Sequence, residues 1–436
     1  MSTKYARYLE QEITKLQRRI KMIKENPDPT KLKSNFMLYE MQLDDNIGQL
    51  EDIKAGKPFA YGHPGNLLRA SGFTVYGGHQ AADKTAQGEG STRYLDCLRD
   101  GGWPELACDR TVVVIVLVTS GDYHRPDFVS VCNLACEMGN HNSQALAQLC
   151  KVPYFVVDIG NDADEENLRY VTDQLAEEVE YMESKVPGIK YDEEELIRLQ
   201  HYDREGAKIA REIYEFRKRR PCPINPRDAQ RESSSPAGRR NPDRAIEYLK
   251  VQRDEIFERA EKGIGVMPEE RLRLMWCTVG INYDESIYRW LEEQCIALHY
   301  VWGMNAHNLG LRMGLYGDLW NGRHLTPLEE EARHSFYNSW NGRGKRLIDD
   351  WLFIVKDQGI DGVVYPLQPG CLPTLNLHKV FADSIEEAAG VPTLGLEIRG
   401  IFREGYNQKD IKAKLSNFIE ICLAKKQARE ALVAAK

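Results

Sequence analysis

The chain has 436 residues, of which 42% are hydrophobic and 28% are charged, and its formal net charge at pH 7 is −8. This length predicts two compact domains, and the composition is typical of a globular enzyme. The negative charge argues against a nucleic-acid-binding protein, which would normally carry a basic face.

The sequence predicts neither a membrane span nor a secretion signal. The longest apolar run, residues 111–118, is much shorter than the about 20 residues that a transmembrane helix needs. The N-terminal stretch MSTKYARYLEQEITK is charged and lacks the apolar core of a signal peptide. We therefore expect a cytoplasmic protein whose cysteines are free thiols. Several of them lie in apolar or proline-rich stretches and are expected to be structural: Cys150, Cys222, Cys277, Cys295 and Cys422.

The first 60 residues are predicted to form a helical arm. Apolar residues recur every three or four positions over 4–26, which indicates an amphipathic helix that Pro27 and Pro29 terminate. A second helix is expected over 33–54. The arm 1–60 would pack on the core of the protein or on a partner subunit.

Residues 61–220 alternate between predicted strands and helices, which indicates a first α/β domain with a doubly wound parallel sheet. The strands are expected at 71–76, 111–118 and 152–160. A turn with two cysteines and a helix through Gln148 follow the second of them, and two long charged helices reach about Arg219.

The stretch 221–243 is rich in Pro, Ser, Gly and Arg and has no periodicity, so it is predicted to be a linker or long surface loop. Residues 244–436 then repeat the α/β pattern as a second domain. Its strands are expected at 271–276, 297–303, 361–367 and 391–398, and its helices at 284–297, up to 358, up to 389 and over 408–434.

Candidate functional residues were sought at the strand ends, because ligands of open α/β sheets bind beyond the carboxyl ends of the strands. Cys132 and Cys136 follow the predicted strand 111–118, Cys371 follows the predicted strand 361–367, and Cys108 lies just before 111–118. Cysteines that converge across a domain cleft could bind a soft metal or an iron–sulfur cluster, and three protein thiolates would leave one iron of a four-iron cube open. The alternative is three unrelated buried thiols.

Other catalytic motifs are absent. The sequence has no GxxxxGK[ST] phosphate loop, no HExxH and no GxSxG, so no nucleotide is expected on this chain. The turn YGGHQ, with Gly77, Gly78 and Gln80, could present N–H groups to a phosphate or thioester oxygen of a substrate, or could be a plain tight turn. Candidate proton donors, which could equally be ordinary surface or core residues, are His79, Tyr123, His124 and Glu137.

Taken together, the motifs WPELACDR, VPYFVVDIG, RLMW, DGVVYPLQPGC and GVPTLGLEIRG, in this order and spacing, resemble the 2-hydroxyacyl-CoA dehydratase / benzoyl-CoA reductase family over most of the chain. The resemblance implies two flavodoxin-like α/β domains that hold a [4Fe-4S] cluster on three cysteines. The matching positions are Cys108, one of Cys132 and Cys136, and Cys371. Cys132, 21 positions before Pro153, fits the family spacing better, with Cys136 as the rival; the paired cysteines leave a larger or differently ligated cluster open.

The resemblance also implies partners and chemistry. Members of the family pair with a related second α/β subunit and receive single electrons from a separate iron–sulfur ATPase, which agrees with the missing phosphate loop. The substrate would be an acyl-CoA: either a 2-hydroxyacyl-CoA that loses water through a ketyl radical, or benzoyl-CoA whose ring is reduced in anaerobic aromatic degradation. The chain length and the helical arm favour the reductase. An electron-relay subunit and a cluster-free scaffold are the non-catalytic alternatives. In either enzyme, Cys136 or Glu137 could contact the cluster ligands without binding the iron itself.

Overall fold

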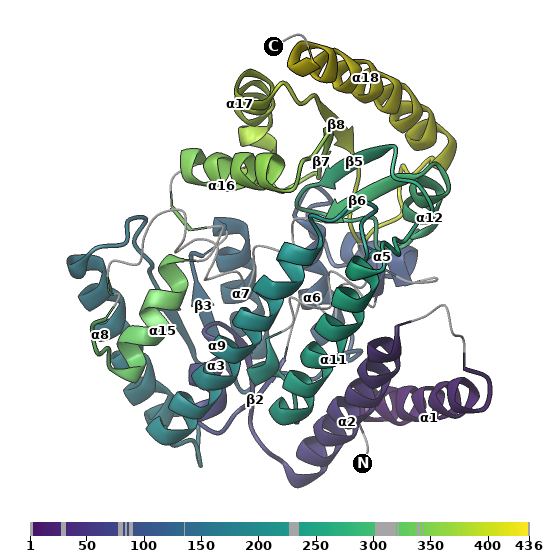
Figure 1. Ribbon diagram of the computed structural model, residues 1–436. Coiled ribbons are helices and arrows are strands. Elements are labelled where there is room, and N and C mark those ends of the chain that lie inside the picture. The colour runs from purple at the N-terminus through teal and green to yellow at the C-terminus, as the bar shows by residue number, and fades with distance from the viewer. Residues whose placement is uncertain are drawn as a thin grey trace.

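The computed structural model describes residues 3–27, 32–76, 82, 85–86, 90–134, 136–225, 235–300, 320, 322–337, 341–342 and 344–434. In these residues the chain forms two four-stranded parallel sheets with helices around them (Figure 1). The strand orders are β2-β1-β3-β4 and β6-β5-β7-β8, so each sheet follows the order second, first, third, fourth. This is the flavodoxin-like order, and it confirms the predicted α/β fold with two doubly wound parallel sheets.

The strands are short and lie in register with parallel neighbours. Those of the first sheet are β1 (Phe59–Gly62), β2 (Thr74–Tyr76), β3 (Phe128–Cys132) and β4 (Tyr154–Val157), and those of the second are β5 (Leu272–Trp276), β6 (Ile296–Tyr300), β7 (Gly362–Leu367) and β8 (Thr393–Glu397).

The helices of the N-terminal half are α1 (Lys4–Glu25), α2 (Lys33–Ala55), α3 (Gly65–Ala70), α5 (Gly90–Asp100), α6 (Asp109–Thr119), α7 (Glu137–Cys150), α8 (Glu165–Lys185) and α9 (Glu193–Phe216). Those of the C-terminal half are the short 3-10 helix η1 (Pro236–Gly238), α11 (Pro242–Glu261), α12 (Ser286–Glu293), α15 (Pro327–Phe336), α16 (Gly344–Asp357), α17 (Leu372–Ala389) and α18 (Gln408–Ala434).

The side chains of β3 alternate between two cores, as the pleat of a strand requires. Phe128 and Cys132 face the core that α3 and α8 form. Val129 and Val131 face the opposite side, where they pack with Ala147 of α7. Helices α5, α6 and α7 pack together on that side. This division of the sheet into an α8 side and an α6–α7 side decides which strand residues can reach the second domain.

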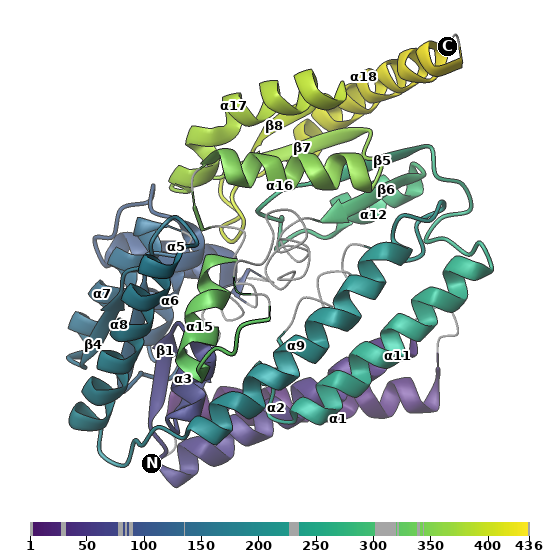
Figure 2. The same ribbon diagram turned by 60° about the vertical axis from the view of Figure 1, so that its left-hand side comes forward.

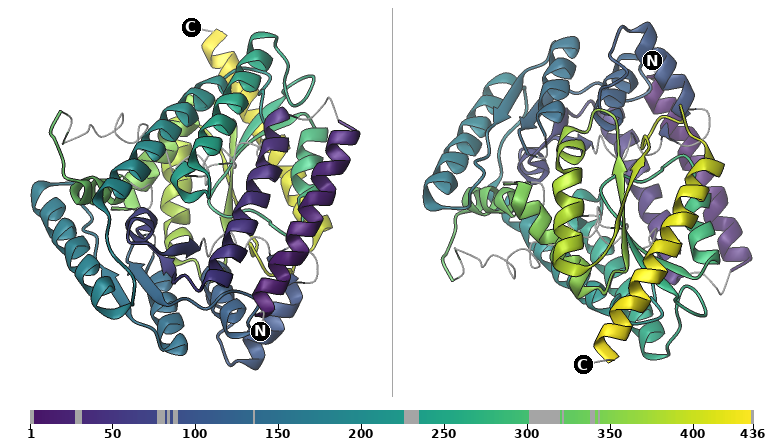
Figure 3. Two further views of the ribbon diagram at one scale, coloured as in Figure 1. Left: turned by 90° about the horizontal axis from the view of Figure 1, so that it is seen from below. Right: turned by 90° about the horizontal axis from the view of Figure 1, so that it is seen from above.

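The second sheet is covered in the same way. Leu274 and Trp276 of β5 pack with α12 and α18, whereas Met275 packs with α16 and α17. Figure 3 shows α17 and α18 on opposite sides of these strands. In Figure 1 this sheet lies at the top of the molecule, above the first sheet.

One prediction of secondary structure is wrong. Residues 111–118, expected to be a strand, belong to helix α6, and the strand before the cysteine turn is β3. Val112–Val118 are all buried, because α6 packs between α5, α7 and the segment Ile401–Phe402 of the second domain. A helix buried on every side has no polar face, so its sequence reads as a continuous apolar run like that of a buried strand. The short strand β1 was not predicted.

The N-terminal arm packs on its own chain. Helix α1 lies along α2, and α2 lies along α11 (Figure 2). Tyr5 contacts Tyr123 ring to ring, with centroids 5.0 Å apart, and Lys4 forms an ion pair of 2.8 Å with Asp122. Of the two placements considered for the arm, the structure shows packing on the core.

The two halves of the sequence interlock beyond the predicted linker. Helix α11 packs along α9, and α15 packs against α8 (Figure 2). Trp320, Phe336 and Tyr337 belong to the core of the first sheet, and the Trp320 indole donates a hydrogen bond of 2.8 Å to Glu165. Residues 226–234 of the predicted linker lie outside the described residues, and α11 begins within its last positions. Segments from both halves of the sequence therefore pack in the core of the first sheet.

Burial agrees with the structural role expected for Cys150, Cys222, Cys277 and Cys422, whose exposed fractions are 5% or less; Cys295 is partly buried. None of the described helices combines the length and the apolar character that crossing a membrane would require.

Candidate functional site

Three cysteines occupy the same local position, the residue that caps the N-terminus of a helix. Cys108 precedes α6, Cys136 precedes α7 and Cys371 precedes α17. The first turn of a helix carries unpaired backbone N–H groups and the positive end of the helix dipole, both of which stabilise a thiolate or another anion. The Cys136 sulfur accepts such a hydrogen bond from the N–H of Gly139, with an N–S distance of 3.4 Å.

Cys136 and Cys371 are equivalent positions of the two sheets. Cys136 comes four residues after Cys132, the last residue of β3, and Cys371 comes four residues after Leu367, the last residue of β7. Strands β3 and β7 are each the third strand in the order second, first, third, fourth. Their carboxyl ends therefore lie at the topological switch point, where ligands of this fold class bind.

Gly370 brings the turn before α17 directly against the turn before α6. A Cβ atom on Gly370 would lie 2.4 Å from the carbonyl oxygen of Leu106 and 2.5 Å from the backbone nitrogen of Cys108. Only glycine allows this approach, and its φ of +77° also favours glycine. The contact places Cys371 of the second domain next to Cys108 of the first.

Gln368 links the same two turns through its side chain. Its Nε2 donates a hydrogen bond to the sulfur of Cys108 at 3.3 Å, and its backbone oxygen accepts one from the N–H of Cys371 at 3.1 Å. The residue is fully buried.

A buried ion pair joins the domains one residue after Cys108. Nη2 of Arg399 lies 2.8 Å from Oδ1 of Asp109, whose side chain is fully buried. The other carboxylate oxygen accepts hydrogen bonds from the N–H groups of Ile401 and Phe402 at 3.3 and 3.2 Å. Arg399 also donates to the carbonyl oxygen of Glu105 at 2.7 Å. A carboxylate with this many partners fixes the start of α6 against the segment that follows β8.

Burial and neighbouring thiols both act on the pKa values of these cysteines. Burial raises the pKa of the Cys108 thiol to about 12, and the Cys371 and Cys136 thiols contribute to the rise. Burial also raises the pKa of Cys136, with a contribution from Cys371. Neighbouring buried thiols resist ionising together, unless a metal centre supplies the compensating positive charge.

Cys132 does not cap a helix. As the last residue of β3 it packs with the α8 core, on the face of the sheet opposite to α6 and α7. Burial raises the pKa of the Cys132 thiol to about 11, and the charges that add to the shift are those of Glu178 and Cys136. Of the two rivals, Cys136 caps a helix as Cys108 and Cys371 do, whereas Cys132 faces the α8 core.

The cysteine donors are of the type that iron–sulfur clusters use. In the part of the chain that the structure describes, no three His, Cys, Asp or Glu side chains are close enough to share one metal ion. A four-iron cube is larger and is ligated by thiolates at its separate corners, so its cysteines lie further apart. Cys108, Cys136 and Cys371 have soft sulfur donors, and backbone N–H groups of Arg110 and Gly139 face the sulfurs of Cys108 and Cys136.

Tyr123 and His124 do not lie at the cysteines. Tyr123 packs on Tyr5, and His124 packs edge-on against Phe59 with ring centroids 4.3 Å apart. Phe59 begins β1, so these residues lie at the amino end of the sheet, away from its carboxyl edge. Burial raises the pKa of Tyr123 and lowers that of His124.

Glu137 is exposed on the first turn of α7, next to Cys136, and accepts a hydrogen bond of 3.2 Å from Asn140. The four candidates of the YGGHQ turn lie outside the described residues: Gly77, Gly78, His79 and Gln80.

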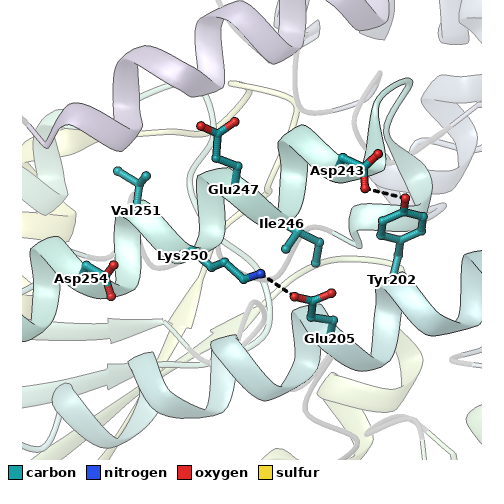
Figure 4. Close-up of a pocket in the computed structure, with 8 residues that line it drawn as sticks. All are labelled: Tyr202, Glu205, Asp243, Ile246, Glu247, Lys250, Val251 and Asp254. Carbon is teal, nitrogen blue, oxygen red and sulfur yellow. Dashed lines mark hydrogen bonds and ion pairs between the residues drawn. The ribbon is translucent and has the colours of Figure 1, made fainter.

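A surface groove of about 390 Å³ lies between α9 and α11 (Figure 4). Its polar side chains pair with each other: Lys250 with Glu205 at 2.7 Å, and Tyr202 with Asp243 at 2.6 Å. None of the candidate residues lines this groove, so it adds nothing to the cysteine site.

Sequence reasoning missed Asp109, Gln368, Gly370 and Arg399 as parts of the site. All four lie inside the motifs that carried the family resemblance: Asp109 in WPELACDR, Gln368 and Gly370 in DGVVYPLQPGC, and Arg399 in GVPTLGLEIRG. The signal was present in the sequence, but the pairing between the motifs is visible only in three dimensions.

The chain contains two flavodoxin-like sheets and three cysteines that each begin a helix. These features define a class of two-domain α/β proteins with cysteines at the carboxyl ends of the sheets. The sequence model of the family described as 2-hydroxyglutaryl-CoA dehydratase, D-component, matches residues 61–422. The chain therefore belongs to this family, and the predicted membership in the 2-hydroxyacyl-CoA dehydratase family is confirmed.

Two curated relatives support this assignment. The chain is 19% identical over 315 residues to the (R)-phenyllactyl-CoA dehydratase alpha subunit of Clostridium sporogenes, which covers 70% of this chain and 72% of the relative. It is 20% identical over 301 residues to the (R)-2-hydroxyglutaryl-CoA dehydratase subunit alpha of Acidaminococcus fermentans, covering 68% of this chain and 60% of that protein. Both relatives are named as alpha subunits of dehydratases.

Proposed function

We propose that this chain is the iron–sulfur subunit of a 2-hydroxyacyl-CoA dehydratase. The observation that carries the proposal is that Cys108, Cys136 and Cys371 each begin a helix, and that Gly370 and Gln368 join the Cys371 turn to Cys108. The names of both relatives support a dehydratase acting on an acyl-CoA.

The proposed ligands of a [4Fe-4S] cluster are Cys108, Cys136 and Cys371. Cys136 replaces Cys132 as the preferred second ligand for two reasons. It caps α7 as Cys371 caps α17, at the equivalent point of the other sheet. Cys132 lies on the α8 side of β3.

When bound, a cube with three protein thiolates supplies low-potential single electrons and one iron without a protein ligand. The chain's own residues hold and shield this site. The helix N-termini direct N–H groups at the sulfurs, Gly370 allows the two turns to touch, and the Asp109–Arg399 pair fixes the domains against each other. Cys108 is almost fully buried, which keeps water away from its sulfur.

An aromatic acyl-CoA reductase of the benzoyl-CoA type is the second candidate. The features that favour it are the chain length and the helical arm. The arm packs on α11 and the first domain of the same chain, so it provides no substrate-related feature of its own. Because both relatives are named as dehydratases, we place the reductase second.

The proposed partners follow from the same relatives, which are named as alpha subunits and so belong to enzymes with further subunits. We propose that a related second α/β subunit completes the enzyme. The energy for low-potential electron transfer would come from a separate iron–sulfur ATPase, since the chain has no phosphate-loop motif.

The test is a reconstitution under anaerobic conditions. The purified chain is first analysed for iron and sulfide, and then combined with its second subunit, the ATPase, MgATP and dithionite. Water loss from (R)-2-hydroxyglutaryl-CoA or (R)-phenyllactyl-CoA is compared with ring reduction of benzoyl-CoA. Turnover of a 2-hydroxyacyl thioester supports the dehydratase, and turnover of benzoyl-CoA alone supports the reductase. An iron-containing chain that supports neither reaction would be an electron relay, and an iron-free chain would be a scaffold.

A further inference from the structure

The fully buried side-chain amide of Gln368 forms hydrogen bonds through both its oxygen and its nitrogen. Its Oε1 accepts a hydrogen bond from the N–H of Gly400 at 3.2 Å, and its Nε2 donates to the sulfur of Cys108 at 3.3 Å. The residue follows β7 directly and lies three positions before Cys371. It therefore touches the loop after β8, the turn before α17 and the thiol that begins α6.

The orientation of this amide is fixed by chemistry. An amide oxygen cannot donate a hydrogen bond, and the backbone nitrogen of Gly400 can only donate. If the amide were turned by 180°, its NH₂ group would face the Gly400 N–H and its oxygen would face the sulfur. The contact with the Gly400 N–H would then be repulsive, and so would the contact of the oxygen with a Cys108 thiolate. The Gly400 N–H thus directs the NH₂ group of Gln368 at the sulfur of Cys108.

The loop after β8 packs closely against the amide of Gln368. A Cβ atom on Gly400 would lie 2.9 Å from Oε1 of Gln368 and 2.6 Å from Cγ1 of Val279, so the loop after β8 closes tightly over the side chain. Val279 is buried, and its closeness keeps water out. A hydrogen bond in such a dry environment is stronger than the same bond in water.

This contact differs in kind from the other hydrogen bonds to the three sulfurs. In the part of the chain that the structure describes, the others come from backbone N–H groups at the helix starts, such as that of Gly139 to Cys136. Every helix start of this kind offers such groups. Gln368 donates from its side chain, so this hydrogen bond depends on the residue type at position 368.

We propose that Gln368 is a positioning residue that raises the reduction potential of the iron–sulfur centre by hydrogen bonding to the Cys108 sulfur; this rests on the proposed function. The reduced centre carries one more negative charge than the oxidised one, and this charge lies partly on the sulfurs. A donor directed at a sulfur stabilises the reduced form more than the oxidised form. Gln368 also fixes the separation of two proposed ligands, since it bonds to Cys108 and to the backbone of Cys371.

The experiment compares Gln368→Met and Gln368→Leu with wild type in the full chain, purified anaerobically. Both replacements remove the hydrogen-bond donor and put an apolar side chain of similar size in its place. The matched control is Gln358→Met. Gln358 is also buried in the second domain, but its Nε2 donates to the carbonyl oxygen of Tyr214 and not to a sulfur. Iron content and melting temperature report structural damage, and an EPR-monitored redox titration reports the midpoint potential.

The expected result is a midpoint potential more negative than that of wild type in both Gln368 variants, with iron content retained, and an unchanged potential in Gln358→Met. Equal potentials in all four iron-containing proteins would overturn the tuning role of Gln368. Loss of iron from both Gln368 variants, with iron retained in the control, would overturn it too, in favour of a role in cluster assembly. A wild-type chain without iron would overturn the proposed function itself, and this inference with it.

Discussion

Gly370 packs its backbone on that of Cys108, so closely that a methyl group at Gly370 would lie 2.5 Å from the Cys108 nitrogen. The two residues belong to different domains and to different cysteine turns. This contact sets how near the Cys371 turn can approach the Cys108 turn.

We therefore expect Gly370→Ala to force the two turns apart. The positive φ costs about 1 kcal/mol for a residue with a Cβ atom, and the overlap with rigid backbone adds to this cost. The expected outcome is a lower melting temperature and loss of most of the iron. Gly405→Ala is the matched control, because Gly405 has a similar φ of +72° and nothing within 4 Å of the place where its methyl group would lie. Equal iron content in the two variants would contradict this account.

Removal of Arg399 should destabilise the joint between the domains. Asp109 is fully buried, so Arg399→Met would leave a carboxylate without its ionic partner. Breaking a buried pair in this way costs about 3–5 kcal/mol. Chemical unfolding of the chain measures the change. Lys379→Met is the control, since Lys379 and Asp383 form an exposed pair whose loss costs at most about 1 kcal/mol. Equal losses of stability in both variants would show that Asp109 is not held as the structure indicates.

The element pattern of the second domain could be read from the sequence because its strands are bounded by polar turns. GVVYPL and TLGLE lie between charged helices and glycine or proline, and both were predicted as strands. In the first domain this reading failed at Val112–Val118. The helix there is buried among α5, α7 and Phe402, so no polar side marks its period.

The misplaced strand also affected the prediction of the cysteine ligands. With the strand placed at 111–118, the alternation of Phe128 to Cys132 along β3 was hidden, and no argument could assign Cys132 to the α8 face. The partners of Cys108 were hidden for another reason. Gln368 lies 260 positions away from it, and Arg399 lies 290 positions from Asp109. Local periodicity carries no information about contacts at such separations.

The choice between Cys136 and Cys132 can be tested by exchanging each for serine, a poor ligand for soft metals. We expect Cys136→Ser to lose most of its iron, because Cys136 begins a helix after the third strand of its sheet, as Cys371 does in the other sheet. Cys132→Ser should keep its iron, and it serves as the control for a sulfur-to-oxygen change four residues away. Iron and sulfide analysis after anaerobic purification gives the answer. The reverse result would restore the family-spacing prediction, and equal loss from both would indicate a different type of cluster.

Glu178 should make the stability of the chain depend on pH. Its side chain is fully buried on α8, in the same core as Cys132. Burial raises the pKa of the Glu178 carboxyl from 4.5 to about 8, and the nearby Ser130 side chain offsets this rise only in part. Between pH 4.5 and 8 the folded chain therefore keeps a proton that the unfolded chain releases. The free energy of unfolding must then fall as the pH rises through this window, by at most about 1.4 kcal/mol per pH unit, and level off above pH 8.

Glu178→Gln removes this titration and keeps a side chain of the same shape. The variant should gain stability relative to wild type as the pH is raised from 5.5 to 8.5, by an amount on the order of 2–3 kcal/mol. Chemical unfolding at several pH values measures the difference. Glu177→Gln, on the exposed side of the same helix, removes a carboxylate without changing the core and should follow the wild-type curve. If Glu178→Gln keeps the pH dependence of wild type, the buried carboxyl does not hold a proton near neutral pH, and polar groups or water must solvate it in the folded chain.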